Sequence, residues 1–421
     1  MIPVFIALAL ASPARQEGDP FGVEPTQDGR RLAVYLVTFG PGPRLWERFG
    51  HNAILIRDTV TGEGVAYDYG RFSFDEKRFF IGFARGRMQY WMGREDGVAL
   101  INAYVRRERS AWMQQLALGP AERIRLRELL EADYERDRGR YRYDYYRDNC
   151  STRLRDAIDQ VTAGAIRATL DSARTDVSYR WHTRRSLQNN PLNYFAVDGG
   201  LGPAADLPVT RYQETFLPGK LREHLGDIMI RAPDGSEVPL VKGEIALSEA
   251  DEFPVPAAPS NLTIRFVAVG VVLGGVFFLL GRGALTTWAR VAFGFLAGTW
   301  ALLAALGGAI LAFLAFFSEH AITYGNENLW QFNLLAVALL PALPGALRGE
   351  PFRRRVALTL AWLVVIGSVV GLLLKLLPGH GQANGEIIGL ALPLHLGLAG
   401  GLTAALRSRS RVPSSALPSL Q

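Results

Sequence analysis

The segment RYRYDYYRDNCSTRLRDAIDQV, residues 140–161, holds the only cysteine of the 421-residue chain. Four apolar residues that follow Cys150 repeat at helical spacing: Leu154, Ala157, Ile158 and Val161. This spacing predicts a helix that begins close to Cys150, with Asn149 and Ser151 as residues of capping type. The backbone N–H groups and the dipole at such a terminus stabilise an anion. The segment therefore predicts a thiolate nucleophile, against the common alternative of a small buried hydrophobe.

The composition of the chain changes near residue 261, from polar and charged to strongly apolar. Five apolar stretches follow, at residues 262–280, 291–317, 332–347, 356–376 and 387–406, and hydropathy predicts them to be membrane spans. The third is short and contains Pro341 and Pro344, so we expect it to be broken or to end early. The sequence thus predicts a soluble domain over residues 31–260, a transmembrane domain over residues 262–406 and a tail over residues 407–421.

Arginines separate the connecting loops into two classes. They gather after the first, third and fifth stretches, whereas residues 318–331 and 377–386 contain no Lys or Arg. By the positive-inside rule, the Arg-rich loops and the C-terminus are cytoplasmic, so the soluble domain is expected on the outer face. Residues 1–14 have the size of a signal peptide. The net charge of +6 is largely this topological signal, and because no nucleic-acid-binding motif is present we expect no nucleic-acid partner.

A thiolate nucleophile requires a base, and the soluble domain offers His51, His182 and His224. Residues 51–58 and 65–72 read as two strands of an antiparallel hairpin around the turn TGEG. His51 begins the first of these strands and can face a helix N-terminus, so it is the preferred base. Residues 119–137 read as an amphipathic helix.

Several motifs resemble those of one family. They are FGHNAILI at residues 49–56, VAYDYGRFSF at residues 65–74, Arg85-Gly86 followed by Tyr90, and the segment around Cys150. Together they resemble the N-terminal periplasmic domain of the Lnb-type lipoprotein N-acyltransferases, over roughly residues 31–260. The arrangement of five spans with polar outer loops is similar to that family as well.

The resemblance implies an α+β fold with a permuted papain-like core, as in the NlpC/P60 group, in which the histidine precedes the cysteine. It implies an enzyme of the bacterial inner membrane that moves an acyl chain from a phospholipid to the α-amine of a diacylglyceryl-cysteine lipoprotein, through a thioester on Cys150 with His51 as base. The residue that orients His51 is Asp68 or Tyr67, and strand parity is not settled by the sequence. No metal or organic cofactor is expected. Asn149 is a candidate oxyanion donor or cap, together with Ser151.

Further residues are candidates for substrate binding: Tyr143, Arg147 and Arg153 near Cys150, and His320, Asn326, Asn328, Gln382 and Asn384 in the outer loops. Polar outer loops are common without any such role. His395, inside the fifth stretch, is interpreted as a neutral side chain bonded to a neighbouring helix, with a functional role as the alternative. The aromatic residues between positions 79 and 91 suit a packed core, or else an acyl groove or membrane contact.

Two other functions stay open at this point. The same Cys–His pair in a hydrolase would pass the acyl group, or a peptide, to water. A transporter or receptor would need neither residue for its activity. The sequence does not indicate the oligomeric state.

Overall fold

The computed structural model describes residues 29–75, 79–232, 234–284 and 286–410. Two compact units divide the chain. The first unit comprises the described residues up to Phe83, together with Arg87–Leu187 and Pro208–Ala258, and the second comprises Ala84–Gly86, Gln188–Leu207 and the described residues from Pro259 onward. The expected signal peptide, residues 1–14, lies outside the described residues.

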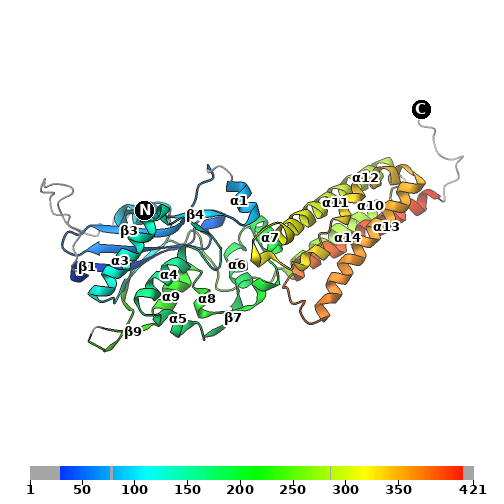
Figure 1. The fold of residues 1–421 in the computed structure, drawn as a ribbon. Coiled ribbons are helices and arrows are strands. Elements are labelled where there is room, and N and C mark those ends of the chain that lie inside the picture. Colours follow the sequence, from blue (N-terminus) through cyan, green and yellow to red (C-terminus); the bar gives the residue numbers. More distant parts are fainter. Residues whose placement is uncertain (1–28, 76–78, 233, 285, 411–421) are drawn as a thin grey trace. The chain divides into compact units, whose positions relative to one another are not determined.

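The first unit is built on a seven-stranded antiparallel sheet (Figure 1). Its strands run in the order β11-β5-β1-β2-β3-β4-β6. They are β1 (Leu32–Phe39), β2 (His51–Asp58), β3 (Gly64–Arg71), β4 (Gln89–Asp96), β5 (Ala111–Leu116), β6 (Tyr141–Arg142) and β11 (Val241–Ser248). The predicted hairpin of residues 51–58 and 65–72 is confirmed as β2 and β3, which pair with Ile54 opposite Tyr67. Two small sheets pair β7 (Arg174–Ser178) with β8 (Pro208–Thr210), and β9 (Met229–Arg231) with β10 (Glu237–Pro239).

Alternation along the strands produces two hydrophobic cores, one on each face of the sheet. On one face, Ile54 and Tyr67 pack with α3 (Pro120–Glu135) and α4 (Cys150–Val161). On the other face, Ala53 and Leu55 pack with α2 (Gly97–Val105). The remaining helices of this unit are α5 (Ala165–Leu170), α6 (Tyr179–Leu187), α8 (Arg211–Glu214), α9 (Pro218–Leu225) and most of α1 (Phe79–Arg85). The helix expected within residues 119–137 is α3.

The second unit contains five helices that are long and apolar enough to cross a membrane. They are Thr263–Arg282 (α10), Thr287–Phe316 (α11), Glu327–Arg348, which includes α12 (Leu335–Arg348), Pro351–Leu376, which includes α13 (Pro351–Leu373), and Gly385–Arg407, which lies within α14 (Gly385–Ser410). The helix α7 (Pro191–Gly200) also belongs to this unit. The expected break at the prolines is absent, because α12 continues through Pro341 and Pro344.

Glycines bring α10 and α14 into close contact. A Cβ at Gly274 would lie 2.3 Å from the Pro393 carbonyl oxygen, and one at Gly397 would lie 2.1 Å from the Gly274 oxygen. Any larger residue at either position would force the two helices apart, as is general for small residues between membrane helices.

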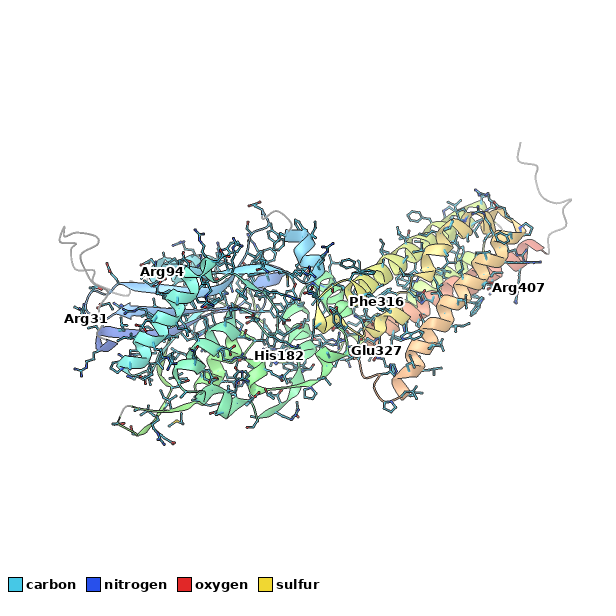
Figure 2. The ribbon with its side chains drawn as sticks, in the orientation of Figure 1. Arg31, Arg94, His182, Phe316, Glu327 and Arg407 are labelled. Carbon is cyan, nitrogen blue, oxygen red and sulfur yellow. The ribbon has the colours of Figure 1, made fainter. Side chains whose placement is uncertain are left out.

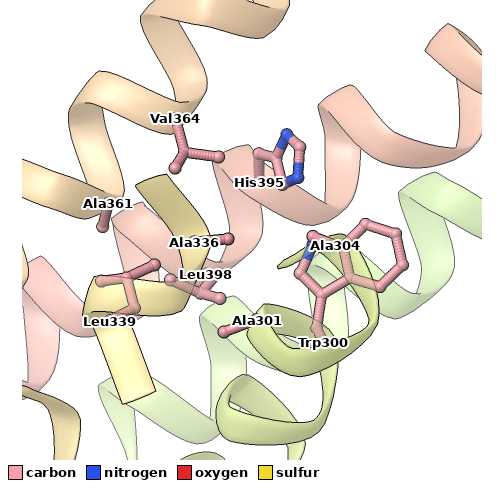
Figure 3. A pocket seen from close by; sticks show the side chains of 9 residues that line it. All are labelled: Trp300, Ala301, Ala304, Ala336, Leu339, Ala361, Val364, His395 and Leu398. Carbon is pink, nitrogen blue, oxygen red and sulfur yellow. The ribbon is translucent and has the colours of Figure 1, made fainter. Parts of the chain in front are cut away.

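His395 lies inside this helical unit, beside a cavity of about 10 Å³ (Figure 3). Its Nδ1 is 2.7 Å from the Ser368 hydroxyl on α13, and its ring centroid is 5.6 Å from that of Trp300 on α11. The cavity is large enough for about one water molecule and too small for a lipid chain. The interpretation of His395 as a side chain bonded to a neighbouring helix is confirmed.

Candidate active site

Cys150 is the first residue of α4, and Asn149 fixes the start of this helix. The Asn149 side-chain oxygen accepts hydrogen bonds from the backbone N–H groups of Ser151 (2.8 Å) and Thr152 (2.9 Å), and the Thr152 hydroxyl accepts one from the Asn149 N–H (2.8 Å). The apolar face of α4 is buried, with Leu154 and Ile158 fully covered. Each such burial contributes roughly 1.5–3 kcal/mol. The cap and this apolar face together hold the thiol at the positive end of the helix dipole.

The two candidate oxyanion residues are both engaged in other contacts: Asn149 caps α4, and Ser151 anchors the start of this helix. Both Asn149 amide hydrogens are used, by the carbonyls of Tyr145 and Phe216 at 2.9 Å each. The Ser151 hydroxyl is fully buried and donates to the Thr215 carbonyl at 2.7 Å. Neither side chain has a hydrogen left for a substrate oxygen. Of the backbone N–H groups at this terminus, those of Asn149, Ser151 and Thr152 also bond within the cap, so the Cys150 N–H is the candidate for that task.

His51 is the first residue of β2 and bonds to Asp68 on β3. Its Nε2 lies 2.9 Å from Asp68 Oδ2. Tyr67 points to the opposite face of the sheet, where its hydroxyl donates to Glu131 on α3. Strand parity therefore places Asp68, and not Tyr67, against the histidine. Because Nε2 is occupied, Nδ1 is the ring nitrogen that remains for a second partner.

Cys150 is the candidate for that second partner, because it lies close enough to the His51 ring to help raise the pKa of this histidine. The two residues come from opposite faces of the sheet, since His51 stacks on Tyr104 of α2 whereas Cys150 belongs to the core under α3 and α4. They meet at the strand end because Gly70 has no side chain. A Cβ at Gly70 would lie 3.3 Å from the Cys150 Cβ and 3.7 Å from Tyr143 Cε2, and the Gly70 φ of +96° is unfavourable for other residues.

Charged neighbours set the protonation of the histidine–aspartate pair. Burial acts to lower the pKa of His51, but electrostatic interactions with Tyr104 and Cys150 and the hydrogen bond to Asp68 outweigh burial, so this pKa is raised well above its ordinary value. Burial acts to raise the pKa of Asp68, but its contacts with His51 and Arg71 outweigh burial, so this pKa is lowered. The arrangement favours a carboxylate at Asp68 beside an imidazolium at His51.

Three residues support this pair and were not identified from the sequence. Arg71 Nε donates to Asp68 Oδ1 at 2.9 Å and also bonds to Glu95. Tyr104 lies parallel to the His51 ring, with 5.7 Å between centroids. The Arg109 guanidinium lies 4.6 Å from the Tyr104 ring centroid and donates to the Gly40 carbonyl. Arg71 follows the YDYG motif directly, and this position was the one signal in the sequence that pointed to any of the three.

The other two histidines of the first unit lie elsewhere and share one carboxylate. His182 Nε2 is 2.9 Å from one Glu214 oxygen, and His224 Nε2 is 2.7 Å from the other. His182 is fully buried (Figure 2). Both imidazoles are thus engaged with the Glu214 carboxylate, so His51 is the histidine of this unit that adjoins Cys150.

Aromatic and basic residues surround the thiol. Tyr143 flanks Gly70 on the same side as Cys150. Arg153 forms a double hydrogen bond with Asp148, at 2.6 and 2.9 Å, and its guanidinium lies 3.8 Å from the Tyr141 ring centroid. Arg147 is exposed, and its backbone N–H donates to the Asp144 side chain. Tyr143 is therefore the one candidate substrate residue of this segment that directly adjoins the thiol.

The candidate residues of the outer loops lie in the second unit, where they bond to one another. The Asn328 amide donates to the Gly199 carbonyl (2.9 Å) and accepts from Asn384 (2.8 Å). The Gln382 amide donates to Asn326 at 3.2 Å, and Asn326 donates to Gly199 at 2.9 Å. All four amides are buried.

This network gives the four amides a structural role, and the substrate contact predicted for them stays a prediction. Glu327, which Figure 2 labels, lies between Asn326 and Asn328 and forms an ion pair with Lys375. The backbone N–H of His320 donates to Ser318, and the His320 carbonyl accepts from Thr323. The sequence showed that these loops are polar, but it gave no sign that their side chains are buried.

Comparison with known proteins completes the description of this site. Residues 24–190 match the family model of the Lnb N-terminal periplasmic domain. This part of the chain is similar to the N-terminal periplasmic domain of the Lnb family. The match contains Cys150, His51 and Asp68, so the whole triad lies inside the shared domain. No curated protein and no solved structure matches the chain.

Proposed function

We propose that this chain is a membrane-bound apolipoprotein N-acyltransferase. The observation that carries the proposal is the Cys150–His51–Asp68 arrangement in a periplasmic-type domain that is joined to five apolar helices. The acyl donor is a membrane phospholipid and the acceptor is the α-amine of a diacylglyceryl-cysteine lipoprotein. Because both substrates are anchored in a membrane, an enzyme that acts on them is expected to be anchored in the membrane as well.

In the first step, the Cys150 thiolate attacks an ester carbonyl carbon of the phospholipid. The carbon–oxygen bond breaks, and the leaving lysophospholipid oxygen takes the proton of the His51 imidazolium. The acyl chain remains on sulfur as a thioester. The raised pKa of His51 supports this step, because the ring is charged and can serve as the acid. We assign stabilisation of the developing oxyanion to the Cys150 backbone N–H at the start of α4.

In the second step, the lipoprotein amine attacks the thioester carbonyl. Neutral His51 accepts the proton of the amine as the carbon–sulfur bond breaks, and the thiolate–imidazolium pair is restored. Asp68 holds the ring in position through Nε2 in both steps. Thioesters react readily with amines, so the covalent route divides one difficult transfer into two easier ones.

The proposal includes a fold relationship and a location. The α4 helix, with its cysteine at the start, and the β2 strand, with its histidine, are the parts that a permuted papain-like core requires. The Arg-rich loops support a cytoplasmic C-terminus and a periplasmic first unit in a bacterial inner membrane.

The test is mass spectrometry of a lipoprotein N-terminal peptide after incubation with the full-length protein and phospholipid vesicles. We expect one added acyl chain in amide linkage with the wild type and none with Cys150→Ser or His51→Gln. His380→Gln, a histidine change in the second unit, serves as the matched control and keeps the activity. Free fatty acid without acylated peptide would identify the hydrolase instead, and product formation by Cys150→Ser would refute the proposal.

A further inference from the structure

Aromatic rings form a continuous series that leads from Cys150 to the surface of the first unit. Tyr143, beside the thiol, stacks on Tyr90 with 4.2 Å between ring centroids. Tyr90 contacts Phe72 at 5.0 Å, and Phe72 contacts Phe74 at 5.2 Å. Phe74 in turn lies 6.2 Å from Phe80 on α1. Each ring touches the next, so the series is an unbroken apolar path.

Exposure rises along this path, from the buried Tyr90 to Phe80, which is 70% exposed. The outer end is a patch of five exposed apolar side chains, which we term the aromatic patch: Trp46, Phe74, Phe80, Ile81 and Phe83. Phe79 links them from beneath, at 5.0 Å from Phe74 and 5.6 Å from Phe80. Large apolar groups clustered in this way on a surface mark an interaction site.

We infer that the aromatic patch contacts the bilayer surface and that the ring series behind it guides the donor's acyl chain to Cys150. The inference rests on the proposed function, since it assigns the binding path of the acyl group that is transferred. Its occupant is a phospholipid acyl chain, which matches the path in two respects: the path is apolar throughout, and it ends at the thiol.

Chain connectivity favours lipid over another occupant. Phe83 stands two residues before Arg85, whose carbonyl accepts a hydrogen bond from Glu319 N at 2.8 Å. Glu319 follows α11, a predicted membrane span, by three residues. The covalent chain therefore keeps Phe83 close to the end of a span. Aromatic rings are the preferred side chains at the membrane interface, and Arg44, 5.7 Å from the Trp46 ring centroid, adds positive charge suited to anionic headgroups.

The experiment compares two acyl donors on full-length protein in vesicles, with Cys150 acylation read by mass spectrometry. The donors are a long-chain phospholipid in the vesicle membrane and a short-chain, water-soluble ester. The test variant is Phe80→Gln/Phe83→Gln, and the matched control is Val60→Gln, an exposed apolar residue of the same unit that lies outside the aromatic patch.

We expect the test variant to lose about 10-fold or more in the ratio of long-chain to short-chain acylation, because two rings leave the apolar contact. Val60→Gln keeps the wild-type ratio. In Cys150→Ala protein, a phospholipid with a photoreactive group at the end of its acyl chain should cross-link to Phe72, Phe74 or the residues of α1.

An unchanged ratio in the test variant would overturn the inference while leaving the proposed function intact. A shift in oligomeric state with an unchanged ratio would show that the patch joins copies of the chain, and would overturn it as well. Absence of wild-type acylation with both donors would instead count against the proposed function.

Discussion

Replacing Gly70 with alanine tests how Cys150 and His51 come together. The φ of +96° disfavours a side chain by roughly 1–2 kcal/mol. The new Cβ would also lie 3.3 Å from the Cys150 Cβ, inside the ordinary carbon–carbon separation of ~3.5–4.0 Å, so Cys150 must shift by a few tenths of an ångström. A displacement of ~1 Å at a reacting centre can cost about 100-fold, so we expect roughly 10-fold slower acylation.

Gly235→Ala provides the matched control. Gly235 has a similar φ of +85°, but nothing lies within 4 Å of its added Cβ. It should therefore reproduce the backbone cost without touching the thiol. The assays are thermal unfolding of the full-length protein in detergent and the rate of thioester formation per folded molecule. Wild-type rates for Gly70→Ala, or an equal loss in both variants, would refute the close-approach argument.

Three further predictions follow from the site and the loops. Asp68→Asn removes a carboxylate that raises the pKa of His51, so the imidazolium will lose its proton at a lower pH. The alkaline limb of the acylation rate should therefore move down by ~1 pH unit or more. In the control Tyr67→Phe, this limb should stay in place. Asn149→Ala removes the cap of the cysteine helix and should lower the free energy of unfolding by ~1–2 kcal/mol in chemical denaturation. Asn328→Ala breaks two buried hydrogen bonds and should destabilise the second unit by ~1–3 kcal/mol in thermal unfolding. Thioester formation per folded molecule should not change. A loss of acylation without a loss of stability would instead support a role of Asn328 in substrate binding.

The local parts of the site were predictable from the sequence. The helical spacing of apolar residues located the helix that begins at Cys150. The β-branched and aromatic residues on either side of the turn TGEG located the hairpin that begins at His51. These features depend on neighbours along the chain. The choice between Tyr67 and Asp68 depended instead on which face of β3 meets His51, and a one-residue change of register reverses that choice.

The remaining features depend on contacts between distant residues. Arg109 and Tyr104 support His51 only because α2 packs on the far face of the sheet. Asn328 and Gln382 look like solvent-facing loop residues until folding buries them against one another. Sequence periodicity carries no information about such partners.

The central claim is that Cys150 carries the acyl group during transfer. The most direct measurement is peptide mass spectrometry of the full-length protein after exposure to one phospholipid of defined chain length, before and after an amine acceptor is added. The account predicts an acyl mass on the Cys150 peptide that is labile to hydroxylamine and disappears when the acceptor peptide becomes acylated. Acylated acceptor without any acyl–Cys150 intermediate, or an acyl group on another residue, would contradict it.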